Sequence, residues 1–317
     1  MRLWKTPEFL RFGAVRSSGL TVLAYHRVGD REATAYDPWV FTVDQMQLEA
    51  HIRYFQKHHR IVDIEEALEI AAGRQKRPGS AVLLTFDDGY LDNYEAGLPV
   101  LRSLNAHAVF FLTTSYLAGD QLAWWDRMAW LVRTAKDRRF RLPLGGETRE
   151  LDLRFKSPAE AIKEVLDLYK ACNADDALRF AESLESASRS VDLPPPERLF
   201  LGPEEAREMS ASGMTIGAHS HSHPILAQMS PDEQFRELSV SRAILEAAIG
   251  STVDVMAYPV GGPGDFTPAT RTIARDCGYR AAFSCHGGAN APEHCDLFDI
   301  KRTAVYWGAE PAWLLDH

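Results

Sequence analysis

The sequence has few cysteines, and their spacing does not fit a metal or redox motif. Cys172, Cys277, Cys285 and Cys295 are the four cysteines in 317 residues, and no two of them form a CxxC pair. This spacing argues against a zinc ribbon and against a thioredoxin-like redox site. It is typical of scattered thiols in a folded core.

Long apolar segments are also missing. No stretch approaches the roughly 20 consecutive apolar residues of a membrane-spanning helix, and the N-terminus lacks the unbroken apolar core of a signal peptide. We therefore expect a cytoplasmic protein without a transmembrane segment. The basic and aromatic opening, residues 2–12, leaves two alternatives: a docked N-terminal helix, which we favour, and a peripheral contact with a membrane surface.

An excess of positive charge is absent as well. The formal net charge is −9, which argues against nonspecific nucleic-acid binding as the main task. Hydrophobic residues make up 45% and charged residues 25% of the chain, as is ordinary for a soluble globular protein. The length of 317 residues fits a single α/β barrel.

Strand-like and helix-like segments alternate along most of the chain. Strands are expected at 20–25, 81–86, 107–112, 214–218, 253–258 and 280–284, and helices at 44–57, 63–72, 93–104, 203–212, 230–249 and 267–277. This alternation predicts parallel strands with helices outside, in a barrel or a doubly wound sheet. Residues 119–200 interrupt it with a predicted hairpin and two amphipathic helical stretches. We interpret them as an insertion in a single domain that spans 1–317.

Two adjacent carboxylates follow one of the buried strands. Asp87 and Asp88 stand in the run TFDDGY, directly before a glycine. An Asp-Gly pair is common in simple turns, so this run alone leaves a turn and a functional site as equal alternatives. Neighbouring ionised carboxylates repel each other unless a cation or separate roles divide them. At the carboxyl end of a barrel strand, such a pair favours a catalytic site.

Three alternate histidines follow a later strand. His219, His221 and His223 stand in the run HSHSHP, and His219 and His223 converge if the chain turns after the strand. His221 would then point elsewhere. His219, His223 and Asp88 would then supply three ligands of the kind that Zn²⁺ prefers over Ca²⁺ or Mg²⁺. Three protein ligands leave a position open for water.

Two further segments end strands on the same predicted face. Val260 stands in the run YPVGG, where backbone N–H groups suit an oxyanion, although a plain Pro-Gly turn explains the run equally well. His26 stands in the run YHRV, where a packed histidine is an equally good explanation.

The order of TFDDGY, HSxxHP and a later YPxG resembles the polysaccharide deacetylase family, also called the NodB-homology or carbohydrate esterase family 4 enzymes. The similarity spans about residues 20–302 without the insertion. The opening LAYHRV is similar to the branch of exopolysaccharide-locus and poly-N-acetylglucosamine deacetylases. The resemblance implies a distorted (β/α) barrel, related to the TIM barrel, and removal of N-acetyl groups from amino sugars of a polysaccharide or of its lipid- or nucleotide-linked precursor.

The resemblance also implies roles for single residues. Asp87 becomes the catalytic base, and Asp88, His219 and His223 become ligands of a divalent metal, most simply Zn²⁺, with Co²⁺, Ni²⁺ or Mn²⁺ as alternatives. The backbone N–H of Val260 would stabilise the oxyanion, and His26 would be the general acid. The late Leu-x-His acid of the family is not evident, and His286, His294 and His317 lack motif support.

One departure from the family concerns the arginine that orients the base. Its position here is Ala257, and Arg302 is a substitute partner for Asp87. The residues expected to bind substrate are Tyr90, Trp124, Trp125, Asp126, Tyr258 and Arg302. For the two tryptophans, anchoring of the insertion is an equal alternative to sugar stacking. A related amidase or deformylase on a small or lipid-linked substrate, and a non-catalytic carbohydrate-binding barrel, are the competing functions.

Overall fold

A computed structural model describes residues 19–75, 79–117, 121–172, 174–189, 198–288, 290–291 and 295–315. The N-terminal opening, His294 and His317 lie outside the described residues, so the predictions that concern them stay predictions. Within the described chain, no helix is both long and apolar enough to cross a membrane.

The centre of the molecule is an eight-stranded sheet in which every strand pair is parallel. Its order is β11-β10-β9-β6-β5-β1-β12, and β4 also pairs with β5. The strands are β1 (Gly19–Tyr25), β4 (Arg60–Ile61), β5 (Ser80–Phe86), β6 (Ala108–Leu112), β9 (Thr215–Ala218), β10 (Val255–Ala257), β11 (Ala281–Phe283) and β12 (Thr303–Ala304). The six predicted strands are confirmed, whereas the two-residue strands β4 and β12 are too short for a periodicity to reveal.

A late segment of the chain joins the two ends of this sheet. Ile300 forms a parallel bridge with Phe283 of β11, and Thr303 pairs with Leu23 of β1. The chain from Ile300 to β12 therefore lies between the first and last strands and closes the sheet into a distorted (β/α) barrel, as predicted.

Alternate strand residues fill the barrel, because successive side chains of a strand point to opposite faces. The rings of Phe111 and Phe283 meet inside it, with centroids 5.3 Å apart. Gly217 makes room for them, since a Cβ at this position would lie 2.5 Å from the Phe111 ring. The barrel is thus a packed core, and functional groups are confined to its ends.

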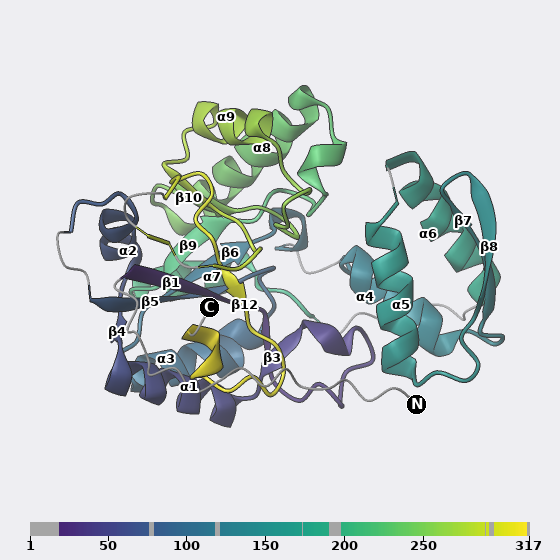
Figure 1. Ribbon diagram of the computed structural model, residues 1–317, viewed down its shortest axis with the longest axis horizontal. Helices are drawn as coiled ribbons and strands as arrows, with labels where there is room; N and C mark the ends of the chain where they lie inside the picture. Colours follow the sequence, from purple (N-terminus) through teal and green to yellow (C-terminus); the bar gives the residue numbers. More distant parts are fainter. Residues whose placement is uncertain are drawn as a thin grey trace.

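Helices cover the outside of the barrel. They are α1 (Gln45–His58), α2 (Ile64–Ala71), α3 (Leu98–Ser103), α7 (Pro203–Ala211), α8 (Pro231–Ile249) and α9 (Pro268–Asp276). Helices α8 and α9 lie on one side of the sheet, and α1 and α3 on the other (Figure 1). A capping box opens α8, in which the Ser230 side chain accepts from the N–H of Glu233. The helix predicted at 93–104 begins instead with a π-helical turn, η2 (Asn93–Gly97).

The connections contain short elements. They are β2 (Arg27–Val28), β3 (Phe41–Val43) and the 3₁₀ turns η1 (Pro38–Val40), η3 (Thr114–Tyr116), η4 (Leu226–Gln228) and η5 (Trp313–Leu315).

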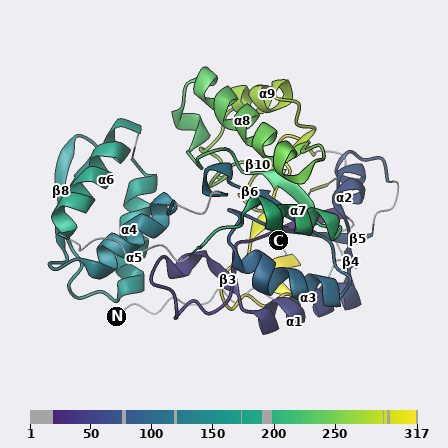
Figure 2. The ribbon, with the colours of Figure 1, turned by 180° about the vertical axis from the view of Figure 1, so that it is seen from behind.

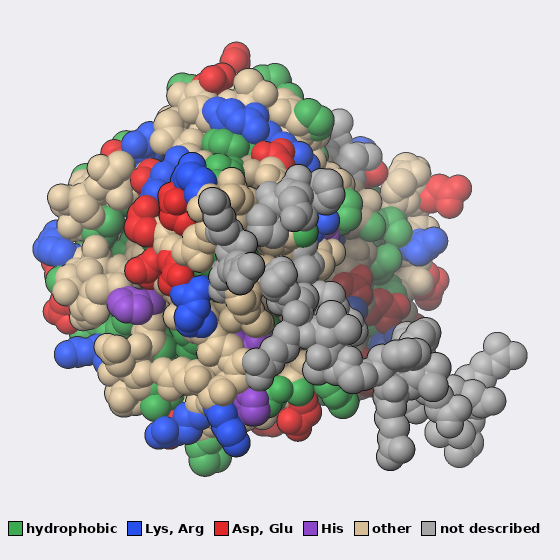
Figure 3. All heavy atoms as spheres, turned by 60° about the vertical axis from the view of Figure 1, so that its left-hand side comes forward, with side chains coloured by type: hydrophobic (Ala, Val, Ile, Leu, Met, Phe, Trp, Pro, Cys, Tyr) green, Lys and Arg blue, Asp and Glu red, His purple; other side chains and the backbone are tan. Residues whose placement is uncertain are grey.

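On the face that Figure 3 shows, basic and acidic side chains lie interspersed.

The segment predicted as an insertion forms a unit with its own apolar core. It contains α4 (Trp124–Thr134), the antiparallel hairpin β7 (Arg139–Leu144) and β8 (Glu147–Asp152), α5 (Pro158–Lys170) and α6 (Ala174–Ser188). This unit stands beside the barrel in both ribbon views (Figures 1 and 2). Its core continues into the barrel through Tyr36, Tyr90 and Phe200, so the two cores meet where the strands end.

Candidate active site

The predicted chemical groups meet at the carboxyl ends of the parallel strands. Asp87 and Asp88 follow β5, His219 follows β9, and Val260 follows β10 by a few residues. Together they border a cavity of about 170 Å³. It is lined by His26, Asp37, Val40, Asp87, Asp88, Trp124, Trp125, Lys170, His219, His223, Val260 and Cys285.

Asp88, His219 and His223 offer three ligand atoms to one point. The atoms lie within 4.8 Å of one another, and all three side chains are buried. The Asp88 Oδ1 atom is 3.6 Å from Nε2 of His219 and 3.3 Å from Nε2 of His223. One carboxylate and two imidazoles in this arrangement match the open ligand set of a catalytic divalent metal.

The hydrogen bonding of this cluster supports the fit. His219 directs Nδ1 at the carbonyl oxygen of Ala257, 2.9 Å away. A histidine that donates through Nδ1 keeps the lone pair of Nε2 free, which is the usual arrangement of a metal-binding histidine. Oδ1 of Asp88 is buried and has no hydrogen-bond partner among the described residues. A buried carboxylate oxygen without a donor is costly unless a cation occupies its surroundings.

Asp87 pairs with Arg302, and its Oδ2 atom lies 3.9 Å from Nε2 of His219 in the cluster. Its two carboxylate oxygens accept from Nη1 and Nη2 of Arg302 at 2.6 and 2.8 Å. Arg302 is fully buried, and it also donates to Thr85 Oγ1 and to the carbonyl of Ser284. Arg302 lies in the segment that closes the barrel. Its place is therefore that of a partner for the base, which differs from the direct contact with substrate that we also expected of it.

The pKa values of these groups follow from burial and their partners. Burial raises the pKa of Asp87, but Arg302 and then His219 outweigh it, so the net pKa lies below the ordinary value. The pKa of Asp88 is also lowered, because the nearby histidines outweigh its burial. Burial lowers the pKa of His219 to about 4. At neutral pH the site therefore holds two carboxylates and a neutral His219, the protonation states that metal ligation requires.

Backbone strain gathers in the same place. Six non-glycine residues of the described chain have positive φ, and Asp88, Ser220, His223 and Val260 are four of them. Their φ angles are 72°, 62°, 60° and 60°. Each such residue costs on the order of 1–3 kcal/mol and persists only where its surroundings fix it, as at functional sites. A β-branched Val260 in this region is a pronounced outlier.

His26 and Val260 both line the cavity, as their predicted roles require. The peptide N–H of His26 donates to Thr42 Oγ1, and its carbonyl accepts from Asn93, so the backbone is fixed on both sides. Asp87 and Asp88 line the same cavity as His26. The roles of His26 and Val260 as acid and oxyanion donor stay predictions.

Four of the residues expected to bind substrate divide into two groups. Trp124 and Trp125 line the cavity. Tyr90 and Asp126 are fully buried, and the Tyr90 hydroxyl donates to Asp126 Oδ2 at 2.7 Å. Their burial differs from the expected contact with substrate: they form a polar link beneath the tryptophans.

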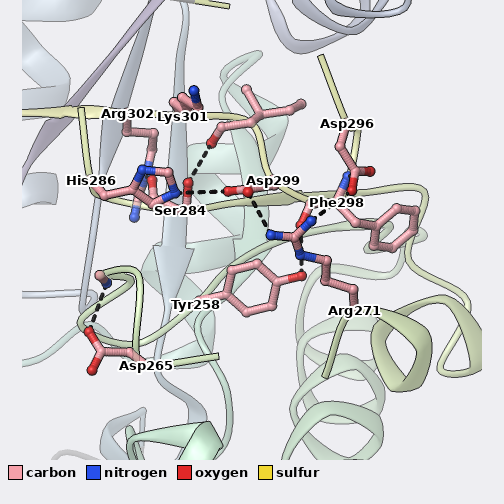
Figure 4. Close-up of polar contacts among 12 residues, drawn as sticks. Tyr258, Asp265, Arg271, Ser284, His286, Asp296, Phe298, Asp299, Lys301 and Arg302 are labelled. Carbon is pink, nitrogen blue, oxygen red and sulfur yellow. Dashed lines mark hydrogen bonds and ion pairs between the residues drawn. The ribbon is translucent and has the colours of Figure 1, made fainter. Parts of the chain in front are cut away.

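Among the described residues, Tyr258, His286 and His221 do not line the cavity. Tyr258 is buried against Phe266, and its hydroxyl donates to the carbonyl of Phe298. His286 points at Asp299, which Arg271 also contacts (Figure 4). The structure thus places Tyr258 in the core, which differs from its expected role in binding substrate. His221 bonds to Thr114 and takes no part in the ligand cluster.

Sequence reasoning missed several residues of the site. Asp37, Val40, Lys170 and Cys285 line the cavity. Their sequence surroundings carry no motif, and Lys170 reaches the barrel only because α5 packs beside it. Glu237 of α8 was also missed, although its carboxylate accepts from the backbone N–H groups of His221 and Ser222 at 2.8 Å and so fixes the histidine loop.

Comparison with known proteins gives one family. The family model described as Polysaccharide deacetylase matches residues 74–282, which is more than half of the chain. The chain is 29% identical over 287 residues to YxkH of Bacillus subtilis (strain 168), a protein whose own name assigns it to the polysaccharide deacetylases. That match covers 90% of this chain and 71% of YxkH.

Solved structures show the same fold at low identity. The deacetylase PplD of Streptococcus pyogenes, in complex with acetate, matches with a TM-score of 0.59 at 19% identity, over 94% of this chain and 96% of PplD. IcaB from Ammonifex degensii matches with a TM-score of 0.57 at 22% identity, over 92% of this chain and 93% of IcaB.

Proposed function

Since the chain belongs to the polysaccharide deacetylase family of carbohydrate N-deacetylases, we propose that it is a metal-dependent hydrolase that removes N-acetyl groups from amino sugars of a polysaccharide or of its lipid- or nucleotide-linked precursor. One observation carries the proposal. A carboxylate paired with a buried arginine, Asp87, lies beside the three-ligand cluster of Asp88, His219 and His223 in a single cavity.

The metal is inferred from the three side chains that could bind it. Asp88, His219 and His223 would hold it, and their oxygen and nitrogen donors suit Zn²⁺ first, with Co²⁺, Ni²⁺ or Mn²⁺ as alternatives. A bound divalent ion supplies polarisation of the amide carbonyl and a lowered pKa of water.

Asp87 is the proposed base. Arg302 keeps its carboxylate ionised and holds both oxygens in one plane, so Asp87 can accept a proton from the water that attacks the acetamide carbon. The backbone N–H of Val260 faces the developing oxyanion. When the carbon–nitrogen bond breaks, His26 gives a proton to the leaving amine. Water and the amide thus become acetate and a free amino sugar.

Trp124 and Trp125 are the proposed walls for the sugar. Both line the cavity, and an aromatic face stacks on the apolar face of a pyranose ring. Lys170 and Asp37, at the same cavity, add one group of each charge for sugar hydroxyls or a charged substituent.

Acetate release tests the proposal. N-acetylglucosamine oligomers and lipid- or nucleotide-linked N-acetyl sugars are compared with their N-formyl analogues, before and after chelation and with each metal restored. We expect acetate release that chelation abolishes and metal restores. Turnover that is insensitive to chelation would contradict the metal mechanism. Preference for the formyl substrates would favour a deformylase instead.

The variant Asp87→Asn separates the base from the metal. We expect it to bind metal as the wild type does, while turnover falls by roughly 10²–10⁴-fold, the usual contribution of general base catalysis. Wild-type turnover in this variant would refute the role of Asp87.

A further inference from the structure

The two histidines of the ligand cluster are held in different ways. Nδ1 of His219 bonds to the carbonyl of Ala257. Nδ1 of His223 is buried and has no hydrogen-bond partner within the described chain. A metal-binding histidine usually donates its second N–H to a partner that fixes the ring, and loss of such a partner typically weakens metal binding 10–100-fold. Something other than a hydrogen bond must therefore fix the ring of His223.

The backbone of His223 does not supply that restraint by itself. His223 has a positive φ of 60°, a conformation that is unfavourable for a residue with a side chain. Its N–H bonds to Ser220 Oγ, and Ser220 is itself strained with a φ of 62°. A loop with two strained residues relaxes unless its surroundings hold it.

The insertion provides the missing contact. The ring of Trp125 packs on the ring of His223, with centroids 4.6 Å apart and planes inclined at 60°. Nε1 of the neighbouring Trp124 donates to the backbone carbonyl of His223 at 3.4 Å. One tryptophan thus restrains the imidazole ring, and the other contacts the peptide that carries it.

Trp125 is itself fixed by a polar chain that returns to the barrel. Its Nε1 donates to the Tyr90 hydroxyl at 2.6 Å, and that hydroxyl donates to Asp126 Oδ2 at 2.7 Å. Tyr90 stands two residues after Asp88 in the sequence. The contacts therefore form a circuit from one metal ligand, Asp88, through Tyr90 and Trp125 to another, His223.

We propose that the insertion is part of the metal site, with Trp125 as the positioning residue that fixes the ring of His223. Aromatic packing does for His223 what a hydrogen bond does for His219. The inference rests on the proposed metal site, but it does not require that the substrate is an N-acetyl sugar. It assigns to the insertion a task besides any contact with the sugar.

Metal titration tests this inference without reference to turnover. Zn²⁺ affinity is measured by chelator competition on the full chain, and the visible spectrum of bound Co²⁺ reports the coordination geometry. The variants are Trp125→Leu, which removes the aromatic face, and Trp125→Phe, which keeps a ring. The matched control is Trp130→Leu, in the same helix α4, because the Trp130 ring packs on Tyr36.

We expect Trp125→Leu to bind Zn²⁺ about 10–100-fold more weakly and to change the Co²⁺ spectrum. Trp125→Phe should restore most of the affinity, and Trp130→Leu should bind metal as the wild type does. Thermal unfolding of the metal-free proteins verifies that all three variants fold.

Three results would overturn the inference. They are wild-type affinity in folded Trp125→Leu, an equal loss in Trp130→Leu, and no rescue by Trp125→Phe. Failure of the proposed function is a separate result: a wild type that binds metal but releases no acetate would refute the deacetylase while leaving the role of Trp125 intact.

Discussion

Two pairs of buried carboxylates lie near the same cavity, and their pKa values are shifted in opposite directions. Asp87 and Asp88, in the barrel, have lowered pKa values. Asp37 and Asp126, where the insertion meets the barrel, have pKa values raised by burial to about 6 and about 7. Asp126 accepts from Tyr90 and from the N–H of Asp37, but its link to a cation is the more distant charge of Arg27.

The difference shows that burial alone does not determine the pKa of a carboxylate. Both pairs are almost completely removed from solvent. The barrel pair stays ionised because Arg302 and the histidines stabilise the negative charge, as oppositely charged neighbours do. The insertion pair has neutral donors, which satisfy hydrogen bonds but compensate little of the cost of burying a charge. Charged partners therefore stabilise the carboxylates of the barrel, whereas the carboxyl groups beside the insertion are held by neutral hydrogen bonds.

The same substitution in the two pairs gives the largest expected contrast. Asp88→Asn removes the anionic ligand between the two histidines, so stoichiometric Zn²⁺ binding and acetate release should both be lost. The loss of activity is at least about 10³-fold, because a catalytic metal is worth several kcal/mol. Asp126→Asn should keep stoichiometric Zn²⁺. Metal analysis after dialysis measures the bound Zn²⁺ of both variants. Equal Zn²⁺ content in the two variants would contradict the assignment of Asp88 as a metal ligand.

Arg302→Gln should raise the pKa of Asp87, as burial raises the pKa values of Asp37 and Asp126. Removal of one partner of a buried ion pair costs about 3–5 kcal/mol of the free energy of unfolding, which denaturant titration measures. Without the guanidinium, burial dominates and the pKa of Asp87 rises, so the acid limb of the pH–rate profile should move to higher pH. Arg302→Lys keeps the charge and should shift that limb less. If the acid limb does not move in Arg302→Gln, that limb does not report the ionisation of Asp87.

Asp126 gives a pH dependence of the opposite sign to that of the barrel pair. Because its pKa is raised in the folded state to about 7, the folded protein holds a proton that the unfolded chain releases from about pH 4 upward. The contribution of Asp126 to stability is thus full below about pH 4 and declines up to about pH 7, by a few kcal/mol at most.

Unfolding of the wild type and of Asp126→Asn, measured from pH 4 to pH 8, tests this sign. The isosteric amide cannot ionise, so the wild type should lose stability relative to the variant as the pH rises. A difference that stays constant over this range would show that Asp126 is ionised in the folded protein.

Tyr90→Phe gives the smallest effect. It leaves Nε1 of Trp125 and Oδ2 of Asp126 without the hydroxyl that joins them, which costs roughly 1–3 kcal/mol of unfolding free energy. The effect on Zn²⁺ affinity should be smaller than that of Trp125→Leu, since the ring contact with His223 stays. A larger loss of affinity than in Trp125→Leu would mean that Tyr90 acts on Asp88 directly.

The sequence predicts the parts of the site that are local in the chain. The carboxylates and the histidines follow strands that hydrophobic runs reveal, and parallel strands bring their carboxyl ends together. Arg302 was expected as a substitute partner of Asp87, and its two bonds to that carboxylate agree with the expectation. The contact of Trp125 with His223 could not be read, because the two residues lie far apart in the sequence. Asp37 and Lys170 carry no motif at all. Side-chain burial was the other failure: Tyr90, Asp126 and Tyr258 stand beside functional residues, yet their hydroxyl or carboxyl groups point into the core.

The segment from Ile300 to Ala304 has a consequence for synthesis on the ribosome. The ion pair of Arg302 with Asp87 joins positions 215 residues apart, so a nascent chain has both acidic residues long before their guanidinium emerges. Until then, docking of β5 would bury an uncompensated anion, which is costly. We therefore expect the acidic pair to stay solvated in the growing chain, ionised as exposed aspartates are at neutral pH. Docking of the segment from Ile300 to Ala304 would then bury the base and its counter-ion together.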